Sequence, residues 1–439
     1  MQGKQEPFLC EENTKTIHSW GEANTLNQLQ ETHPAMKERI ISIGRPSVLR
    51  HANAQTVLRL LRKSGPCSRA DLVRASGLSA PTVTNVVKDL LSENLIEPLG
   101  EGESSGGRPP DMIRFKAERG CMLSVEITAG SLSFLLTDLD GSELAVHRVS
   151  LANRKTTPAA ICKYIDEALR ALLRGQQMSR EQLLAMVVAV PAITDVKNGV
   201  VLSISTLEEW RSVPLRSMLN AVVDCLVIVE NDTNLAAQGE LYRGAAQGEQ
   251  DFVLISIGTN VGAGIVLGGR IHHGSQWSAG EIAYLRLPYI SRRHPTIHQF
   301  GELETVLTVS GILKGWQETE DKLEAGKKPR QKKIEAIDIL NLAESGDTRA
   351  LKLVQQRAEI VSDIVLNLLL ILNPNLILLG GEIGGHSVLI DSVQKQLEGS
   401  EFALTRIAAG ALAERASLWG GVSLALQHIP SILLPAPPI

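Results

Sequence analysis

The sequence predicts an α/β protein with a small helical domain in front of a larger body. Three observations support this prediction: short helical stripes before residue 100, strand-like runs separated by helical patterns beyond residue 120, and a length of 439 residues that exceeds one ordinary domain. Apolar residues make up 44% of the chain and aromatic residues 3%, so we expect a large and mainly aliphatic core.

Residues 1–44 are polar and show no sustained hydrophobic period, so we interpret them as an N-terminal extension. The pattern then changes, and an apolar helical stripe over residues 57–61 ends at Ser64-Gly65-Pro66. Ser68 and Ser79 can each cap a further helix, because a serine hydroxyl accepts a hydrogen bond from a free N–H group of the first turn. We therefore predict three short helices in this region.

A Gly-rich turn at residues 100–107 and a short strand at residues 112–115 follow the third helix. Three short helices and such a β wing describe a winged helix-turn-helix, which we assign to residues 45–117. The start of a recognition helix faces base edges in the major groove, and an extended Gly-Gly-Arg-Pro-Pro arm suits a narrow minor groove. The candidate DNA-binding residues are Ser79, Ala80, Thr82, Thr84, Asn85, Lys88 and Arg108. The alternative is a generic helical bundle with surface threonines and an ordinary linker arginine.

The charge distribution permits a DNA-binding module. The formal net charge of −4 excludes a uniformly basic coat. Residues 45–116 nevertheless carry 11 Lys and Arg against 7 Asp and Glu, so a mildly basic segment precedes an acidic body.

Cysteine usage and hydropathy favour a cytoplasmic protein. The cysteines are Cys10, Cys67, Cys121, Cys162 and Cys225. Their odd number and wide spacing indicate neither a disulfide framework nor a CxxC metal pair. No charged N-terminal region followed by an apolar stretch indicates a signal peptide. The longest apolar run, residues 364–379, is interrupted by Asn373-Pro374-Asn375 and is too broken to span a membrane.

Beyond residue 118, strands alternate with helices. The expected strands are residues 121–125, 133–138, 143–149, 184–190, 227–230, 252–257, 264–267 and 376–379. The expected helices are residues 158–173, 232–243, 349–371 and 418–428, and the charged stretch 318–333 is expected to be a solvated helix or loop. We predict two related α/β lobes, residues 118–240 and 241–439.

Polar side chains gather where one strand of the body ends and a helix begins, at Glu230-Asn231-Asp232-Thr233-Asn234. A carboxylate at such a position can accept a proton from an alcohol, although a single Asp there is more often a helix cap. The density of Asn and Asp favours a site that faces a ligand.

Three further features can contribute to a site. The Gly-rich turn at residues 258–264 can present N–H groups to phosphate, or it can simply join two hairpin strands. Glu281 and Glu304 are carboxylates in loops and can bind sugar hydroxyls, although each alone is a common solvated charge. The histidines of this region have no accompanying cysteines, so we expect no metal site.

In this order, these features resemble the ROK family of bacterial repressors and sugar kinases, over residues 45–428. The resemblance implies an actin-like, two-lobed ATPase fold with a sugar cleft between the lobes. It implies that Asn231 and Asp232 bind the sugar, with Asp232 matching the catalytic base of the kinases. Glu281 and Glu304 match two further family glutamates, and Thr206 lies near a position where sugar-binding members carry Asn.

The chain departs from the kinase pattern at several positions. Kinase members begin their first phosphate loop with Asp-x-Gly-Gly-Thr, where this chain has Glu126-Ile127-Thr128-Ala129-Gly130. Asn260 replaces a glycine of the second loop, and Ala283-Tyr284 replaces a Gly-His pair that holds sugar and zinc. The three zinc cysteines are absent, with Arg292-Arg293-His294 nearby. We therefore expect no zinc, no cofactor and little or no kinase activity.

The leading hypothesis is a cytoplasmic transcriptional repressor that is released from DNA by a sugar or sugar derivative. As the resemblance implies, it would be a homodimer or homotetramer on a palindromic operator. One alternative is an active ATP-dependent sugar kinase with an accessory DNA-binding domain. Another is a regulator whose body binds no small molecule.

Overall fold

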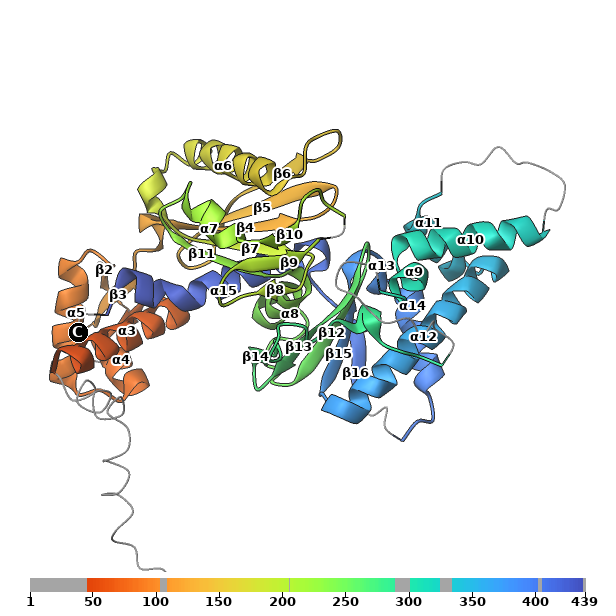
Figure 1. The fold of residues 1–439 in the computed structure, drawn as a ribbon. Coiled ribbons are helices and arrows are strands. Elements are labelled where there is room, and N and C mark those ends of the chain that lie inside the picture. Colours follow the sequence, from red (N-terminus) through yellow and green to blue (C-terminus); the bar gives the residue numbers. More distant parts are fainter. Residues whose placement is uncertain are drawn as a thin grey trace, which may run out of the picture.

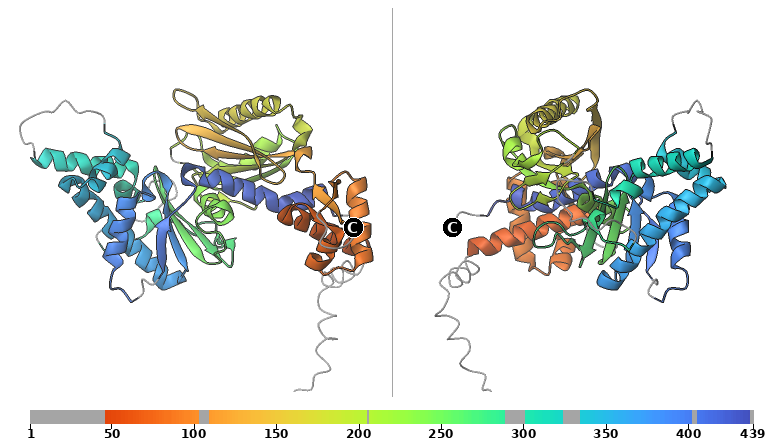
Figure 2. Two further views of the ribbon diagram at one scale, coloured as in Figure 1. Left: turned by 180° about the vertical axis from the view of Figure 1, so that it is seen from behind. Right: turned by 45° about the vertical axis from the view of Figure 1, so that its right-hand side comes forward.

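The computed structural model describes residues 46–102, 109–204, 206–288, 301–323, 334–401 and 405–436. It consists of a helical N-terminal domain, residues 46–119, which we call the head, and a two-lobed α/β body (Figure 1). The head and the second lobe lie at opposite ends of the molecule, with the first lobe between them (Figure 2). The predicted extension at 1–44 lies outside the described residues.

The head has the predicted winged helix-turn-helix fold. Its helices are α3 (Pro46–Ser64), α4 (Arg69–Ser76) and α5 (Ala80–Ser92). Its sheet has the antiparallel order β1 (Cys67–Ser68), β3 (Asp111–Phe115), β2 (Ile96–Glu101). Strands β2 and β3 form the wing.

Local sequence explains where the helices of the head begin and end. The Ser68 N–H group donates to Asp71 Oδ2 at 2.8 Å, and the Asp71 N–H group donates to Ser68 Oγ at 3.2 Å, which is a complete capping box. Gly77 ends α4 with a φ of 69°, a left-handed conformation that glycine adopts without steric cost. Ser79 caps α5, because its Oγ accepts the Thr82 N–H group at 3.4 Å.

The first lobe is built on a five-stranded sheet of order β11-β7-β4-β5-β6. These strands are β4 (Cys121–Ile127), β5 (Ser131–Asp138), β6 (Glu143–Ser150), β7 (Leu183–Val190) and β11 (Leu226–Asn231). The first three form an antiparallel meander, and β7 and β11 add in parallel. The lobe also contains α6 (Pro158–Gly175), α7 (Leu215–Asn220), β8 (Thr194–Asp195), β9 (Val200–Ser203) and β10 (Arg211–Val213).

The second lobe repeats this topology with the order β14-β13-β12-β15-β16. The strands are β12 (Phe252–Ile257), β13 (Val261–Leu267), β14 (Arg270–Ile271), β15 (Leu376–Gly380) and β16 (Arg406–Ala409). An antiparallel meander is again followed by two parallel strands. Its helices are α9 (Glu304–Leu307), α10 (Val309–Leu323), α11 (Ala336–Glu344), α12 (Thr348–Leu372), α13 (Gly381–Gly384) and α14 (Ser387–Leu397).

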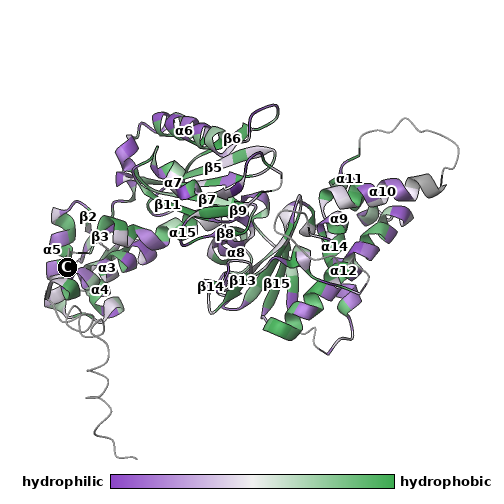
Figure 3. Ribbon diagram, in the orientation of Figure 1, coloured by the Kyte–Doolittle hydropathy of each residue, from purple (hydrophilic) through white to green (hydrophobic). Residues whose placement is uncertain are grey.

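Central strands such as β7 and β15 are hydrophobic along their length, as expected for parallel strands that are covered on both faces (Figure 3). None of the described helices is long and apolar enough to cross a membrane.

Two helices join the parts of the molecule. Helix α8 (Asp232–Arg243) follows β11 and packs against β13 of the second lobe. Helix α15 (Ala416–Leu433) packs on α8, β4 and β7, so the end of the chain lies with the first lobe, although the sequence analysis placed it in the range 241–439. Glycines allow this packing: a Cβ added at Gly420 would lie 1.7 Å from the Leu235 carbonyl oxygen.

Candidate functional site

A large cavity, which we call the cleft, opens between the two lobes of the body. Its volume is about 1730 Å³, and its walls include the loop after β4, the start of α8 and the turn between β12 and β13. The five effector-binding residues proposed from the sequence all line it: Thr206, Asn231, Asp232, Glu281 and Glu304. The structure thus brings together side chains that lie far apart in the sequence.

Asn231 and Asp232 are held by the first turn of α8. Asn231 is its N-cap: Asn231 Oδ1 accepts the Asn234 N–H group at 3.0 Å, and Asn231 Nδ2 donates to the Ala192 carbonyl at 3.2 Å. Asp232 Oδ1 accepts hydrogen bonds from the N–H group of Thr233 at 2.7 Å and from its Oγ1 at 3.2 Å. In the described part of the chain, no donor reaches Asp232 Oδ2, so this oxygen is available to a ligand.

The carboxyl groups of the cleft have raised pKa values. Burial and the nearby Glu126 and Glu281 raise the pKa of Asp232 to about 7. Burial and Glu304 raise the pKa of Glu281 to about 7. Burial also raises the pKa of Glu304, although the N–H groups of Gly301, at 2.8 Å, and Val261 oppose this. Asp232 and Glu281 can therefore be neutral or ionised near neutral pH.

Such carboxyl groups suit a ligand with several hydroxyl groups. An ionised carboxylate accepts hydrogen bonds only, whereas a neutral carboxyl group both donates and accepts. A hydroxyl group both donates and accepts, so it can form a hydrogen bond with either the ionised or the neutral carboxyl group. Perturbed titration in a cleft is also typical of functional sites.

The loop after β4, where the kinases bind phosphate, is closed on itself. The Thr128 N–H group donates to the Ser131 carbonyl at 2.9 Å, and the Ser131 N–H group donates to Thr128 Oγ1 at 3.0 Å. Thr128 Oγ1 also donates to the Ser131 carbonyl at 3.0 Å. Two backbone N–H groups and the hydroxyl are thereby occupied, whereas the N–H groups of Ala129 and Gly130 at the tip of the turn have no hydrogen-bond partner among the described residues.

Backbone packing accounts for the glycines of the second turn. The Gly258 N–H group donates to the Asn260 carbonyl at 3.0 Å, which closes the turn between β12 and β13. A Cβ added at Gly264 would lie 2.6 Å from the Thr233 carbonyl oxygen of α8. A hairpin that packs closely on α8 therefore requires Gly264 even without a bound phosphate.

Glu126 is a cleft residue that the sequence analysis did not assign to the effector site. It lies near the end of β4, lines the cleft and accepts a hydrogen bond from Ser417 Oγ at the start of α15. The carboxyl ends of parallel strands meet at one edge of a sheet, and β4 and β11 are both parallel to β7. This rule alone would have placed Glu126 near Asp232.

The head presents the first turns of α5 to solvent. Ser79, Ala80, Thr84, Asn85 and Lys88 are exposed, and Thr82 is half-buried. The hydroxyls are partly used within the helix, since Ser79 Oγ lies 2.8 Å from Thr82 Oγ1 and Thr84 Oγ1 donates to the Ala80 carbonyl at 2.9 Å. Asn85 and Lys88 have no side-chain partner among the described residues, which leaves both available to DNA. Arg108 lies outside the described residues.

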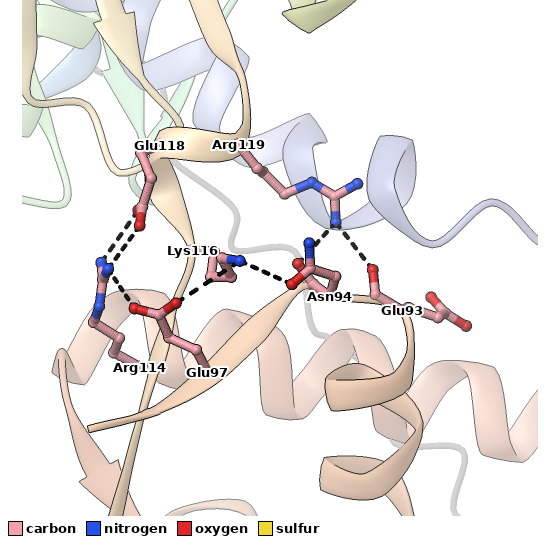
Figure 4. A network of polar contacts seen from close by, with 7 residues as sticks. All are labelled: Glu93, Asn94, Glu97, Arg114, Lys116, Glu118 and Arg119. Carbon is pink, nitrogen blue, oxygen red and sulfur yellow. Dashed lines mark hydrogen bonds and ion pairs between the residues drawn. The ribbon is translucent and has the colours of Figure 1, made fainter. Parts of the chain in front are cut away.

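Several basic side chains of the wing are neutralised within the head (Figure 4). Arg114 pairs with Glu97 and, at 2.6 Å, with Glu118, while Lys116 Nζ donates to Asn94 Oδ1 at 2.8 Å. The network ties β2 and β3 to the segment that leads into the body. The positive charge counted from the sequence therefore overstates what the wing offers to DNA phosphates.

Comparison with known proteins identifies the family. A model of the ROK family matches residues 122–428, and a model of the MarR family matches residues 53–98. This chain belongs to the ROK family.

ROK proteins of both kinds, repressors and kinases, are similar to this chain. The xylose repressor of Bacillus spizizenii is 24% identical over 90% of this chain and 100% of its own length. The glucokinase of Halalkalibacterium halodurans is 31% identical over 59% of this chain and 79% of its own. The fold also matches the crystal structure of a ROK family transcriptional regulator, a homologue of the Escherichia coli MLC protein, with a TM-score of 0.74. The match covers 88% of this chain and 98% of the regulator, at 24% sequence identity. The predicted fold, a winged head on a ROK body, is confirmed.

The zinc site that other ROK members carry does not fit this chain. No cysteine occurs beyond Cys225, and the position of the family histidine is Tyr284. Burial, Glu281 and Glu304 raise the pKa of Tyr284 to about 12, so its phenol stays neutral. Within the described ranges, no group of His, Cys, Asp and Glu side chains is arranged to hold a metal ion. Residues 292–294 lie outside these ranges.

Proposed function

We propose that this ROK protein is a DNA-binding transcriptional repressor, and that a sugar or sugar derivative in the cleft weakens its binding to an operator. The observation that carries the proposal is the combination of an exposed recognition helix with a cleft whose carboxyl groups persist while its phosphate loop, residues 126–130, departs from the kinase pattern. The similarity to a xylose repressor over 90% of the chain supports it.

In this proposal the head reads double-stranded DNA through α5. Its first turns enter the major groove, where Asn85 can bind an adenine edge and Lys88 a phosphate. Ser79, Ala80, Thr82 and Thr84 allow close approach because their side chains are small, and Arg108 extends toward the minor groove. A homodimer or homotetramer would place two heads on half-sites about 34 Å apart. Such a protein acts on DNA in the cytoplasm.

The sugar would bind through the polar groups that converge in the cleft. Asp232, Glu281 and Glu304 supply carboxyl oxygens, and Asn231 and Thr206 supply neutral polar groups. Because binding free energies are linked, a sugar that weakens operator binding must itself bind more weakly to the operator-bound protein, by the same factor.

Calorimetric titration tests the sugar half of this proposal. The purified chain is titrated with D-xylose, D-glucose and N-acetyl-D-glucosamine, each with and without ATP and magnesium. Binding that is independent of ATP is the expected result. The operator half is tested with a duplex selected from a random library by the protein, and the sugar that binds is expected to weaken that complex. Tighter operator binding with sugar would contradict the induction mechanism.

An active sugar kinase is the second candidate function. It is favoured by the 31% identity to a glucokinase and by the position of Asp232, whose pKa of about 7 suits a general base. The loop at residues 126–130 argues against it, because Thr128 and Ala129 stand where the kinase pattern has two glycines. Release of ADP upon addition of sugar, ATP and magnesium would establish the kinase and exclude the proposal of a non-enzymatic sensor.

A regulator that binds no small molecule is the third candidate. Tyr284 lines the cleft where other members carry a sugar-binding histidine, and this favours a modified or lost sugar site. Asp232→Asn distinguishes it from the leading proposal. If operator release by a sugar is unchanged in this variant, the cleft is not the sensor.

A further inference from the structure

The head and the first lobe share one hydrophobic core. Val57, Leu58 and Leu61 of α3 belong to the same buried cluster as Val422 and Ile429 of α15. The cluster continues into the first sheet of the body. The head is therefore packed on α15 rather than tethered by a flexible linker, and a shift of α15 must displace it.

Helix α15 begins in the cleft. Ser417 in its first turn lines the cleft and donates a hydrogen bond to Glu126. Its next turn fits tightly, because a Cβ at Gly421 would lie 2.1 Å from Ser124 Oγ of β4 and one at Gly420 would overlap Leu235 of α8. This helix therefore moves with the wall of the cleft.

Helix α8 also begins in the cleft, at Asp232, and ends on the side of the head. Its last residue, Arg243, donates to the Gly141 carbonyl at 3.0 Å, in the turn between β5 and β6. The Arg243 guanidinium also lies 4.2 Å from the centre of the Trp419 ring of α15. The two helices and this turn are thus joined beside the head.

Arg62, near the C-terminus of α3, contacts α15 and the turn between β5 and β6. Its Nη1 donates to the Leu426 carbonyl of α15 at 2.9 Å, and its Nε lies 3.6 Å from Asp140 Oδ1 in the turn between β5 and β6. Its guanidinium also lies 5.7 Å from the centre of the Phe115 ring of the wing. The side chain is only 10% exposed, and its Nε has no hydrogen-bond partner. A buried cation of this kind is strongly restricted in position. If it moves away from its partners, their contacts no longer offset the cost of removing its charge from water.

We propose that Arg62 is the positioning residue through which the orientation of the DNA-reading head follows the state of the cleft. Helix α15 and the turn at Asp140, both connected to cleft residues, both contact this side chain of the head. The head also contacts α15 through the shared core and through the hydrogen bond from Gln55 Nε2 to the Leu434 carbonyl at 3.2 Å, but Arg62 joins α15 and the turn to each other as well as to the head. The inference rests on the proposed function and adds the path by which sugar binding reaches α5. Arg62 itself contacts neither the cleft nor the exposed face of α5.

The test measures the coupling ratio, which is the operator Kd with sugar divided by the operator Kd without it. The wild-type chain, Arg62→Met and Asp140→Asn are compared with D-xylose, D-glucose and N-acetyl-D-glucosamine as probes. Asp140→Asn keeps the hydrogen bond of Arg62 to α15 and removes only the charge pair, so it serves if Arg62→Met does not fold. Arg406→Met, which breaks the pair with Glu249 in the second lobe, is the matched control.

We expect a wild-type ratio of about 5 to 150, the range typical of allosteric coupling. Asp140→Asn should lower the ratio at least about threefold, Arg62→Met should lower it by a larger factor because it also removes the hydrogen bond to α15, and Arg406→Met should leave it unchanged. Sugar affinity without DNA should stay the same in all variants. A merely structural role would lower thermal stability or operator affinity in both states and preserve the ratio, which would overturn this inference alone. A wild-type ratio of one would overturn the proposed function together with it.

Discussion

His273 Nε2 lies 2.7 Å from Glu230 Oε2, and this contact joins the second lobe to the first across the base of α8. Glu230 is the penultimate residue of β11, next to the cleft, and is only 3% exposed. Its other carboxyl oxygen accepts the Asn231 N–H group at 2.8 Å and the Asn234 side chain at 3.1 Å. His273 follows β14 and packs edge-on against Trp277. The pair therefore holds the turn that contains Asn231 and Asp232 in place.

His273→Ala should destabilise the protein more at low pH than at high pH. The hydrogen bond to Glu230 raises the pKa of His273, so the folded protein holds this proton more tightly than the unfolded chain. The resulting stability is fully present below the unfolded pKa of about 6.5 and is lost as pH rises through the higher folded value. We expect the unfolding free energy, measured by denaturant unfolding, to fall by about 1–3 kcal/mol at pH 6 and by less at pH 9.

His272 is the control for this prediction, since it is exposed and adjacent in sequence. His272→Ala should leave stability unchanged at both pH values. An equal loss at pH 6 and pH 9 in His273→Ala would show that packing on Trp277, and not the charged hydrogen bond, is the main contribution.

Asp232→Asn should stabilise the protein at alkaline pH. The raised pKa of Asp232 means that the folded state favours the neutral carboxyl group, so wild-type stability falls as pH rises from about 4, the unfolded value, to about 7. Asn is neutral throughout and can keep the hydrogen bonds from Thr233. We expect the unfolding free energy to rise by about 1–3 kcal/mol at pH 8.5 and not to change at pH 4. Each unit of pKa shift corresponds to about 1.36 kcal/mol, and water in the cleft reduces the effect of the whole shift.

Asp195→Asn is the matched control. Asp195 is half-buried in β8, and hydrogen bonds from Asn198 lower its pKa. Substitution of Asp195 should give no gain in unfolding free energy at pH 8.5. If Asp232→Asn also gives no gain, the Asp232 carboxylate is hydrated in the folded protein and burial does not control its titration.

Local features were predictable from the sequence, and long-range packing was not. The caps at Ser68 and Ser79 and the left-handed Gly77 follow from hydrogen bonds within four residues, so the head could be derived element by element. The return of α15 to the first lobe depends on Gly420, whose purpose is visible only beside Leu235.

The site divides in the same way. Asp232 stands out at a strand end, whereas Glu281 and Glu304 are loop carboxylates that only the family resemblance distinguishes from common solvated charges. Arg62 looks like one of several basic residues on α3, and only its burial between α15 and Asp140 distinguishes it.

Gly420→Ala should be strongly destabilising. The added Cβ would overlap the Leu235 carbonyl at 1.7 Å, and the surrounding atoms are backbone of α8, which cannot move aside without shifting the helix. We expect a loss of about 3 kcal/mol or more in unfolding free energy.

Gly175→Ala is the control, since a Cβ there meets nothing within 4 Å and lies at the end of α6. It should be neutral or slightly stabilising, by about 0.5–1 kcal/mol. Similar effects at both positions would mean that α8 and α15 are not closely packed.

Asn85→Ala and Lys88→Ala should weaken operator binding in different ways. Both side chains are exposed on α5 without partners in the described structure, but an amide can distinguish base edges, whereas an ammonium group binds any phosphate. Asn85→Ala should reduce discrimination at one base pair by about 1–3 kcal/mol and leave the salt dependence unchanged. Lys88→Ala should weaken all duplexes alike and lower the slope of log K against log salt by about 1. Binding of single-base operator variants at several salt concentrations measures both quantities.

Glu93→Ala, at the opposite end of the helix, should reproduce neither effect. If Asn85→Ala changed only the salt slope, α5 would contact the backbone rather than the bases, and another element of the head would have to read the operator.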